Sequence, residues 1–356
     1  MELKMPIQTL PGITAKSIKT NRITTRVLFS GPEDGIPVLL LHGNLSSATW
    51  WEEVMVTLPP GFRGIASDQR GFGEADLAQK IDATRGMGDL ADDAVALLDH
   101  LGIEQAHIVG NSLGGSVTWR LLMDCPERFL TATQVAPGSP YGFGGVKGIN
   151  ATPCYADFAG SGGGLANPEL LKRLAAGDRS ADTMFSPRSA FRMLVVKPPF
   201  IPQREDALIE AMLAMHLGDR DFPGDFARSP NWPFVAPGQW GTANALSPKY
   251  ADDVNRLYAV TPKVDILWIR GSHDLAVSDN AVSDPATVGA AGLLPNWPGP
   301  DVYPPQPMIG QTRAVLEKYA AAGGSYREVV IPATGHVPYI ENLAAFNAVF
   351  HPQLIG

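Results

Sequence analysis

A serine lies in a glycine-rich turn between two predicted elements, where it could act as a nucleophile. The turn Gly110-Asn-Ser112-Leu-Gly114 separates a buried strand predicted over 105–109 from a helix predicted over 113–123. A G-x-S-x-G sequence in this position raises the serine hydroxyl above the end of the strand, because only small neighbours fit so sharp a turn. The N–H of Leu113, at the start of the helix, is then free to bind an oxyanion. We therefore predict that Ser112 attacks a carbonyl carbon.

A serine hydroxyl needs a general base, and the base needs a carboxylate that orients it. Two loops late in the chain supply these groups. His336 follows a strand predicted over 326–331, and Asp274 follows one predicted over 264–269. The order Ser112, Asp274, His336 is the order expected for a catalytic triad in an α/β fold.

Other residues could fill two of these roles. His273 is the alternative base, although its side chain diverges on the loop from that of its neighbour Asp274. Asp279 and Asp284 are alternative acids, but no predicted strand comes directly before either of them. Both lie in a Pro-rich loop over 276–309, which is expected to reshape the rim of the site.

A second oxyanion donor is expected from the loop after the first strongly apolar strand. This loop reads His42-Gly-Asn44-Leu45, and the N–H of Asn44 is the predicted donor, with that of Leu45 as the alternative. The ring of His42 is predicted to organise the loop. The predicted pocket residues are Trp50, Trp51, Met212 and Met215. For the two tryptophans, burial in the core is the alternative.

The elements that would position these residues alternate between strands and helices. The apolar run Ile36 to Leu41 suits a strand that is buried on both faces, and 89–101 carries a helical stripe of Leu and Ala. Such alternation predicts an α/β fold with a mostly parallel central sheet flanked by helices.

The alternation breaks in the middle of the chain. Over 137–250 the sequence has Gly-rich loops and a helix predicted over 204–217, apolar on two faces. We therefore predict one core domain from residues 1–136 and 251–356, with 137–250 as a helical cap insertion. Ligands bind at the carboxyl ends of the strands in open α/β sheets, so the cap is expected there.

The composition narrows the class of partner. The chain has 356 residues, of which 45% are hydrophobic and 18% charged, and a net charge of −8 without a basic cluster. Nucleic acid and anionic membrane surfaces are therefore not expected partners. Cys125 and Cys154 are too few for a disulfide scaffold or a Cys-rich zinc site, and neither a metal nor a cofactor is expected.

The sequence also suggests where the protein works. It lacks an apolar run of 18 residues and a recognisable signal peptide, which predicts a cytoplasmic protein with no membrane partner. A homodimer is the one protein assembly that we consider.

Taken together, these motifs resemble the α/β-hydrolase superfamily, in its capped branch. The D-x-R-G-x-G turn is typical of the branch that holds esterases, lactonases, epoxide hydrolases, haloalkane dehalogenases and C–C bond hydrolases. Epoxide hydrolases and dehalogenases use Asp as the nucleophile, so Ser112 argues against both. The matching pieces are HGN at 42–44, DQRGFG at 68–73, GNSLGG at 110–115, GSHD at 271–274 and GH at 335–336.

The resemblance implies a cofactor-free serine hydrolase that cleaves a carboxylic ester or a lactone. C–C bond hydrolysis, amide cleavage and perhydrolysis use the same triad and stay as alternatives, as does a non-catalytic ligand-binding protein on this scaffold. The acidic net charge and the Met-containing apolar helix at 204–217 predict an uncharged, largely apolar substrate of medium size. For an anionic substrate, Arg188, Arg192 and Lys197 would be the anchors.

Overall fold

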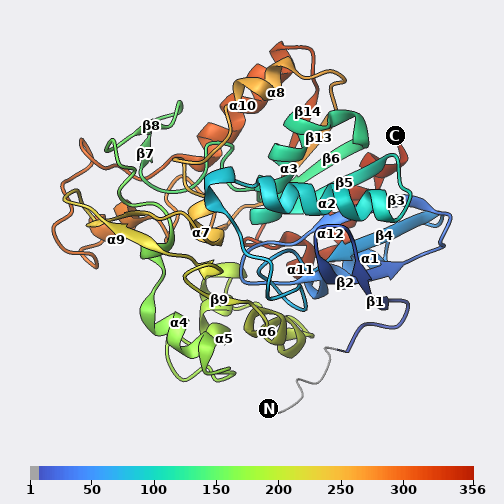
Figure 1. Cartoon of the computed structure of the whole chain (residues 1–356), viewed down its shortest axis with the longest axis horizontal. Coiled ribbons are helices and arrows are strands. Elements are labelled where there is room, and N and C mark those ends of the chain that lie inside the picture. The colour runs from blue at the N-terminus through green and yellow to red at the C-terminus, as the bar shows by residue number, and fades with distance from the viewer. Residues whose placement is uncertain (1–7) are drawn as a thin grey trace.

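The computed structural model describes residues 8–356 and has a central sheet between layers of helices (Figure 1). Its eight strands follow the order β1-β2-β4-β3-β5-β6-β13-β14. β1 and β2 form an antiparallel pair, β2 is antiparallel to β4, and every other neighbouring pair is parallel. The predicted α/β fold with a mostly parallel sheet is confirmed. The strands are β1 (Thr14–Lys19), β2 (Thr24–Ser30), β3 (Ile36–Leu41), β4 (Phe62–Ser67), β5 (Ala106–Asn111), β6 (Phe129–Val135), β13 (Asp265–Gly271) and β14 (Tyr326–Ile331).

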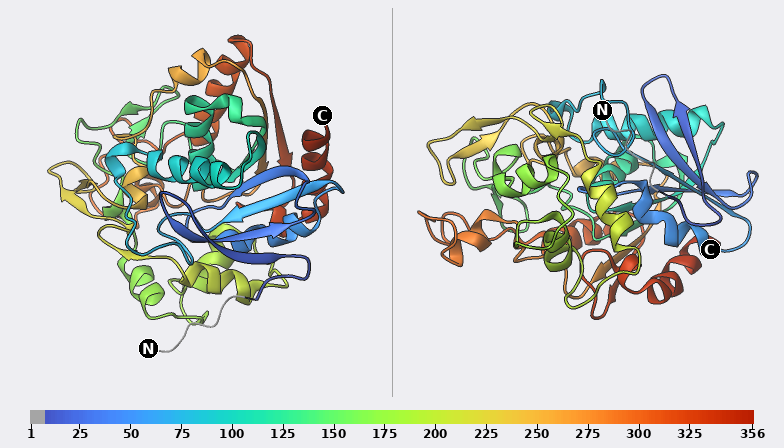
Figure 2. Two further views of the ribbon diagram at one scale, coloured as in Figure 1. Left: turned by 45° about the vertical axis from the view of Figure 1, so that its right-hand side comes forward. Right: turned by 90° about the horizontal axis from the view of Figure 1, so that it is seen from below.

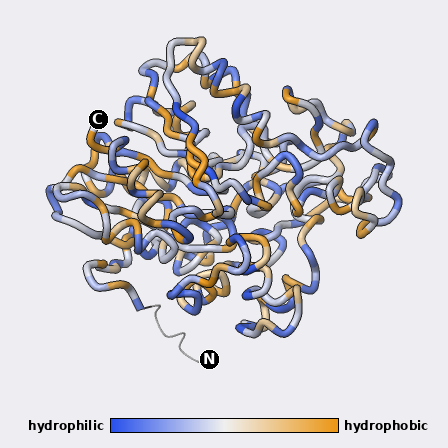
Figure 3. The backbone as a smooth tube through the Cα atoms, turned by 180° about the vertical axis from the view of Figure 1, so that it is seen from behind, coloured by the Kyte–Doolittle hydropathy of each residue, from blue (hydrophilic) through white to orange (hydrophobic). Residues whose placement is uncertain are grey.

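Helices cover both faces of the sheet, and alternate residues of a strand point to opposite layers. In β3, Leu39 and Leu41 pack with α2, α3, α8 and α10, whereas Val38 and Leu40 pack with α1, α11 and α12. Because both faces are buried, the strand is continuously apolar. Apolar stretches lie near the centre of the chain trace in Figure 3, and others reach its outline. These helices are α1 (Glu52–Val56), α2 (Gly88–His100), α3 (Leu113–Asp124), α8 (Asn255–Ala259), α10 (Met308–Ala321), α11 (Pro338–Glu341) and α12 (Leu343–Ile355).

Residues 136–264, between β6 and β13, form what we call the inserted segment. Part of it gathers on one side of the molecule with the loop that carries α9 (Pro285–Ala290), whereas its helices over 168–213 lie below the sheet (left view of Figure 2). The boundaries 137–250 of a separate cap stay a prediction. Besides α8, the inserted segment holds β7 (Val146–Lys147), β8 (Thr152–Pro153), α4 (Pro168–Ala175), α5 (Pro187–Ala190), α6 (Glu205–Leu213), β9 (Leu217–Gly218), β10 (Phe222–Pro223), β11 (Phe226–Arg228), β12 (Val235–Pro237) and α7 (Thr242–Ala245).

The helix predicted over 204–217 is shorter in the structure, where α6 covers only Glu205–Leu213. Beyond it the chain is drawn onto the core, where the N–H of His216 donates to the carbonyl of Gly71 at 3.0 Å. The two separate apolar faces stay a prediction. Leu208, Ile209 and Met212 of α6 are buried in one cluster, whereas Met215, beyond the end of α6, is buried in the other.

Within residues 8–356, no helix combines the length and the apolar character that crossing a bilayer requires.

Candidate active site

Ser112 occupies a strained turn between β5 and α3. Its φ of 53° lies in the left-handed region, which costs about 1–3 kcal/mol for a residue with a side chain. Two glycines permit the turn. A Cβ on Gly114 would lie 2.1 Å from the carbonyl oxygen of Leu41, and one on Gly110 would lie 2.3 Å from that of Gly114. The strain and the tight approach of α3 to the strand ends are the features expected of a nucleophile elbow.

Asp274 and His336 are in direct contact. His336 Nδ1 lies 2.8 Å from Asp274 Oδ2, and both side chains are buried. The other carboxylate oxygen accepts the N–H groups of Ala276 at 2.8 Å and Val277 at 2.9 Å. With Nδ1 donating to the carboxylate, Nε2 carries the free lone pair that a general base needs.

The loop that carries His336 is joined to the elbow through Asn111, the residue before Ser112. Asn111 Nδ2 donates to the carbonyl of Val135 at 3.0 Å and to that of His336 at 3.4 Å. Tyr339 Oη donates to Asn111 Oδ1 at 3.3 Å. Sequence reasoning missed Asn111 and Tyr339, although Asn111 is part of the elbow motif itself.

The predicted oxyanion loop lies against the elbow. A Cβ on Gly43 would lie 3.1 Å from the Cβ of Ser112, so the loop and the serine are in close contact. The N–H of Leu45 is occupied, because it donates to Asn44 Oδ1 at 3.1 Å. The backbone N–H of Asn44 has no partner within residues 8–356, which favours Asn44 over Leu45 as the donor.

His42 holds this loop in place from the inside. Its Nδ1 lies 2.8 Å from the carbonyl of Gly43, and its Nε2 accepts the N–H of Gln69 at 3.0 Å. Complete burial lowers the pKa of His42 to about 4, against the opposing effect of the Asp68 charge. The ring is therefore neutral at physiological pH, and its contacts are those of a structural residue.

The alternative base and acids lie elsewhere. His273 is exposed and its Nδ1 contacts Ser272 Oγ at 2.8 Å. Asp279 accepts two N–H groups at the start of α10, and Asp284 accepts two more at the start of α9 and at Gln306. Within residues 8–356, His336 pairs with Asp274 alone among the carboxylates.

The four predicted pocket residues are buried in the core. Trp50 donates from Nε1 to the carbonyl of Leu208 at 3.2 Å, and Trp51 stacks on Tyr339 with ring centroids 4.2 Å apart. Met212 packs in the same cluster as both tryptophans, whereas Met215 packs on the opposite face of the sheet. These contacts agree with burial in the core, which was the alternative for the tryptophans. A role of the four residues in substrate binding stays a prediction.

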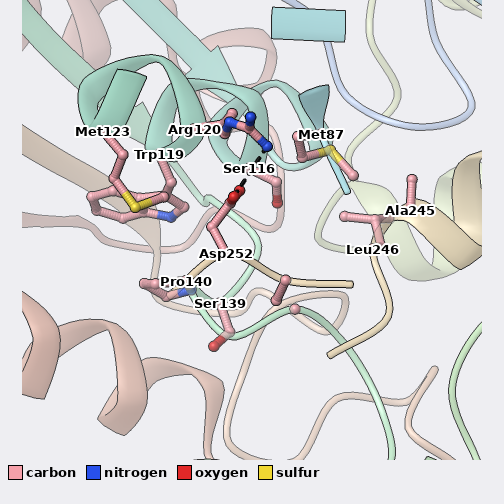
Figure 4. Close-up of a pocket in the computed structure, with 12 residues that line it drawn as sticks. Met87, Ser116, Trp119, Arg120, Met123, Ser139, Pro140, Ala245, Leu246 and Asp252 are labelled. Carbon is pink, nitrogen blue, oxygen red and sulfur yellow. Dashed lines mark hydrogen bonds and ion pairs between the residues drawn. The ribbon is translucent and has the colours of Figure 1, made fainter. Parts of the chain in front are cut away.

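A small recess lies beside α3, one turn beyond Ser112 (Figure 4). Ser116 points into it between apolar side chains, and Arg120 pairs with Asp252 at 3.0 Å across its edge. Ser139 also lines it, but its hydroxyl donates to Gln311 Oε1 at 2.7 Å. Ser116 Oγ is buried and has no hydrogen-bond partner among the described residues. The recess has room for a water molecule but not for an ester substrate.

No set of three or more His, Cys, Asp and Glu side chains is grouped for metal binding within residues 8–356.

Comparison with known proteins places the chain in a family. The family described as "alpha/beta hydrolase fold" matches residues 36–146. An uncharacterized carboxylesterase of Bacillus subtilis (strain 168) is 36% identical over 124 residues, which is 35% of this chain and 41% of that relative. The 2-hydroxymuconate semialdehyde hydrolase of Pseudomonas sp. (strain CF600) is 30% identical over 217 residues, covering 52% of this chain and 75% of the relative.

A solved structure shows the same fold. The 2-hydroxy-6-oxo-6-phenylhexa-2,4-dienoate hydrolase of Rhodococcus sp. strain RHA1 has a TM-score of 0.60 at 18% identity, and the match covers 97% of this chain and 99% of the other. The chain spans only about two fifths of the length of several curated relatives that it matches. The sheet, the elbow and these matches together show that the chain belongs to the α/β-hydrolase family.

Proposed function

We propose that the protein is a serine hydrolase that cleaves a carboxylic ester or a lactone through an acyl-enzyme. The observation that carries the proposal is the Asp274–His336 contact, in which the backbone of His336 is joined through Asn111 to the strained turn of Ser112. A non-catalytic protein would have no need to maintain that strain together with a buried acid–base pair.

The proposed reaction assigns one role to each of these groups. Ser112 Oγ attacks the carbonyl carbon and transfers its proton to His336 Nε2, while Asp274 stabilises the imidazolium. The carbonyl oxygen becomes an oxyanion, which the N–H groups of Leu113 and Asn44 bind; each donor contributes on the order of 3 kcal/mol. The imidazolium then protonates the departing alkoxide. Water, deprotonated by His336, hydrolyses the acyl-enzyme by the reverse steps.

The charges of the inserted segment support an uncharged substrate. Arg192 forms an ion pair with Glu205 at 2.6 Å, and Arg188 pairs with both Glu205 and Asp206. Two of the three cations predicted as anion anchors are therefore already neutralised. A substrate carboxylate would have to compete with these pairs, whereas a neutral acyl chain would not.

C–C bond hydrolysis is the second candidate. It is supported by the 2-hydroxymuconate semialdehyde hydrolase, a relative whose match covers 52% of this chain. The neutralised arginines favour the ester, because 2-hydroxymuconate semialdehyde carries a carboxylate.

The test compares three substrate series and one label. A fluorophosphonate should label the wild-type protein and not the Ser112→Ala variant. The kcat/KM values for neutral acyl esters and lactones should exceed those for matched esters with a free carboxylate by at least tenfold, and 2-hydroxymuconate semialdehyde should be a poor substrate. Faster turnover of the semialdehyde than of every ester would instead establish the second candidate. Failure to label would reject both.

A further inference from the structure

A carboxylate outside the proposed triad joins the inserted segment to the loop of His336. Glu341, the last residue of α11, accepts the N–H of Gly335 on Oε1 at 2.6 Å. Its Oε2 accepts the N–H of Lys197 at 2.8 Å. Gly335 directly precedes His336, and Lys197 belongs to the inserted segment. One side chain thus bridges two backbone segments that are distant in sequence.

Residues 195–197, which we call the strap, touch the His336 loop directly as well. The N–H of His336 donates to the carbonyl of Val195 at 2.8 Å. The two backbones are so close that a Cβ on Gly335 would lie 2.8 Å from that carbonyl oxygen and 2.9 Å from the nitrogen of Lys197. A side chain at position 335 would therefore force the strap away.

The strap is held in the core on its other side. It begins at Val195, the last residue of the π-helical turn Phe191–Val195. The ring of Phe191 packs edge-on against Trp50 with centroids 5.6 Å apart. Val196 is buried in the same cluster. The strap is thus a fixed support, and Glu341 fastens the His336 loop to it.

Only a carboxylate satisfies both donors of this junction. Each oxygen of Glu341 accepts one backbone N–H, whereas a glutamine would present an NH₂ group to one of the two N–H groups. Burial raises the pKa of Glu341, and the two backbone donors oppose that shift because they stabilise the anion. Losing a partner here leaves a buried donor unsatisfied, which is more costly than losing an exposed contact.

We propose that Glu341 is a positioning residue, which sets the place of His336 by fastening its loop to the strap. The inference rests on the proposed function, since it takes His336 as the base. Loss of the fastening should move the imidazole relative to Ser112 and Asp274 without rebuilding the substrate pocket. The turnover number should therefore fall while KM changes little.

The test measures kinetics and amide hydrogen exchange in two variants. Glu341→Gln removes one acceptor, and Gly335→Ala pushes the strap away with Glu341 intact. Each should lower kcat about tenfold with KM within about twofold, and should speed exchange in peptides covering 195–198 and 335–337 about tenfold. Glu317→Gln, an exposed residue on α10, is the matched control and should change neither.

The wild-type protein supplies a further measurement. The amides of Lys197, Gly335 and His336 should exchange with one common free energy of opening, because one junction protects them all. Unequal free energies of opening for these three amides would overturn the proposal. So would wild-type exchange rates, or a wild-type kcat, in both folded variants. If Glu341→Gln fails to fold, Gly335→Ala and the wild-type exchange decide. If Ser112→Ala keeps full activity, the proposed function fails, whereas the exchange data still report on the junction.

Discussion

Asp274 divides its two oxygens between His336 and the backbone. Oδ2 contacts Nδ1 of the imidazole, and Oδ1 accepts the N–H groups of Ala276 and Val277. The carboxylate cannot turn without breaking three contacts, so the orientation of the imidazole is fixed by the loop after β13.

This arrangement makes Asp274→Asn a severe change. The new NH₂ group must face either the imidazole Nδ1–H or the two backbone N–H groups, and all of these are donors. We expect kcat to fall by about 10³ to 10⁴, as when the tautomer of a triad histidine is lost. The control is Asp279→Asn, whose carboxylate only caps the start of α10 and which should keep at least half the activity. The reverse ranking would place the acid in the 276–309 loop.

Ser112 and His336 should behave as one unit. Ser112→Ala and His336→Ala should each lower kcat by several orders of magnitude, and the double variant should be little worse, because residues that act together are not additive. Steady-state rates with an activated neutral ester measure this. More than about a tenth of wild-type activity in Ser112→Ala would exclude Ser112 as the nucleophile.

The close contact of Gly43 with the elbow predicts a position-specific effect. In Gly43→Ala the new Cβ would lie 3.1 Å from the Cβ of Ser112 and from Asn111 Oδ1, so the oxyanion loop must shift by a few tenths of an ångström. We expect kcat to fall about tenfold, or ~1.4 kcal/mol in the barrier, with the melting temperature nearly unchanged. Gly88→Ala in α2, where the added methyl meets atoms no closer than 3.4 Å, is the control and should have full activity.

The pH dependence of the free energy of unfolding should reveal the lowered pKa of His107, on β5. Burial lowers the pKa of His107 to about 4, from an ordinary value of 6.5. Between these values the unfolded chain binds a proton that the folded chain does not, so the stabilisation present above pH 6.5 is lost as pH falls toward 4. We expect this residue to account for a loss on the order of 3 kcal/mol.

Urea denaturation of wild type and His107→Gln across this range measures the effect. The wild-type curve should fall more steeply, because the variant lacks the titrating ring. His42 makes a loss of the same sign in both proteins, since its pKa is also lowered to about 4. Parallel curves would show that His107 does not lose its proton on folding.

The sequence predicts the central sheet well, because its signals are local. The run Ile36–Leu41 is continuously apolar since both faces of β3 are covered, and the small residues of the elbow have no other explanation than a sharp turn. The antiparallel strand β1 escapes prediction because it lies at the edge of the sheet, largely exposed, and its residues show no buried face.

The contacts of the inserted segment could not be predicted, because they join distant backbone groups. In the hydrogen bond from Lys197 to Glu341 the donor is a backbone N–H, which every residue except proline carries. The residue type at position 197 therefore cannot predict this bond. The end of α6 at Leu213 is likewise set by the bond between His216 and the core residue Gly71. Periodicity alone extends that helix too far.

The way the inserted segment joins the sheet limits how such a protein can be shortened. β6 and β13 are parallel neighbours, so the chain leaves β6 at the carboxyl ends of the strands and must return to their amino ends before β13 begins. A crossover of this kind takes about a dozen residues. Residues 251–264, which include α8, supply 14 residues for that return. Excising 137–250 would thus leave a topologically complete core whose crossover is intact, but it would remove the strap and leave the histidine loop without its support.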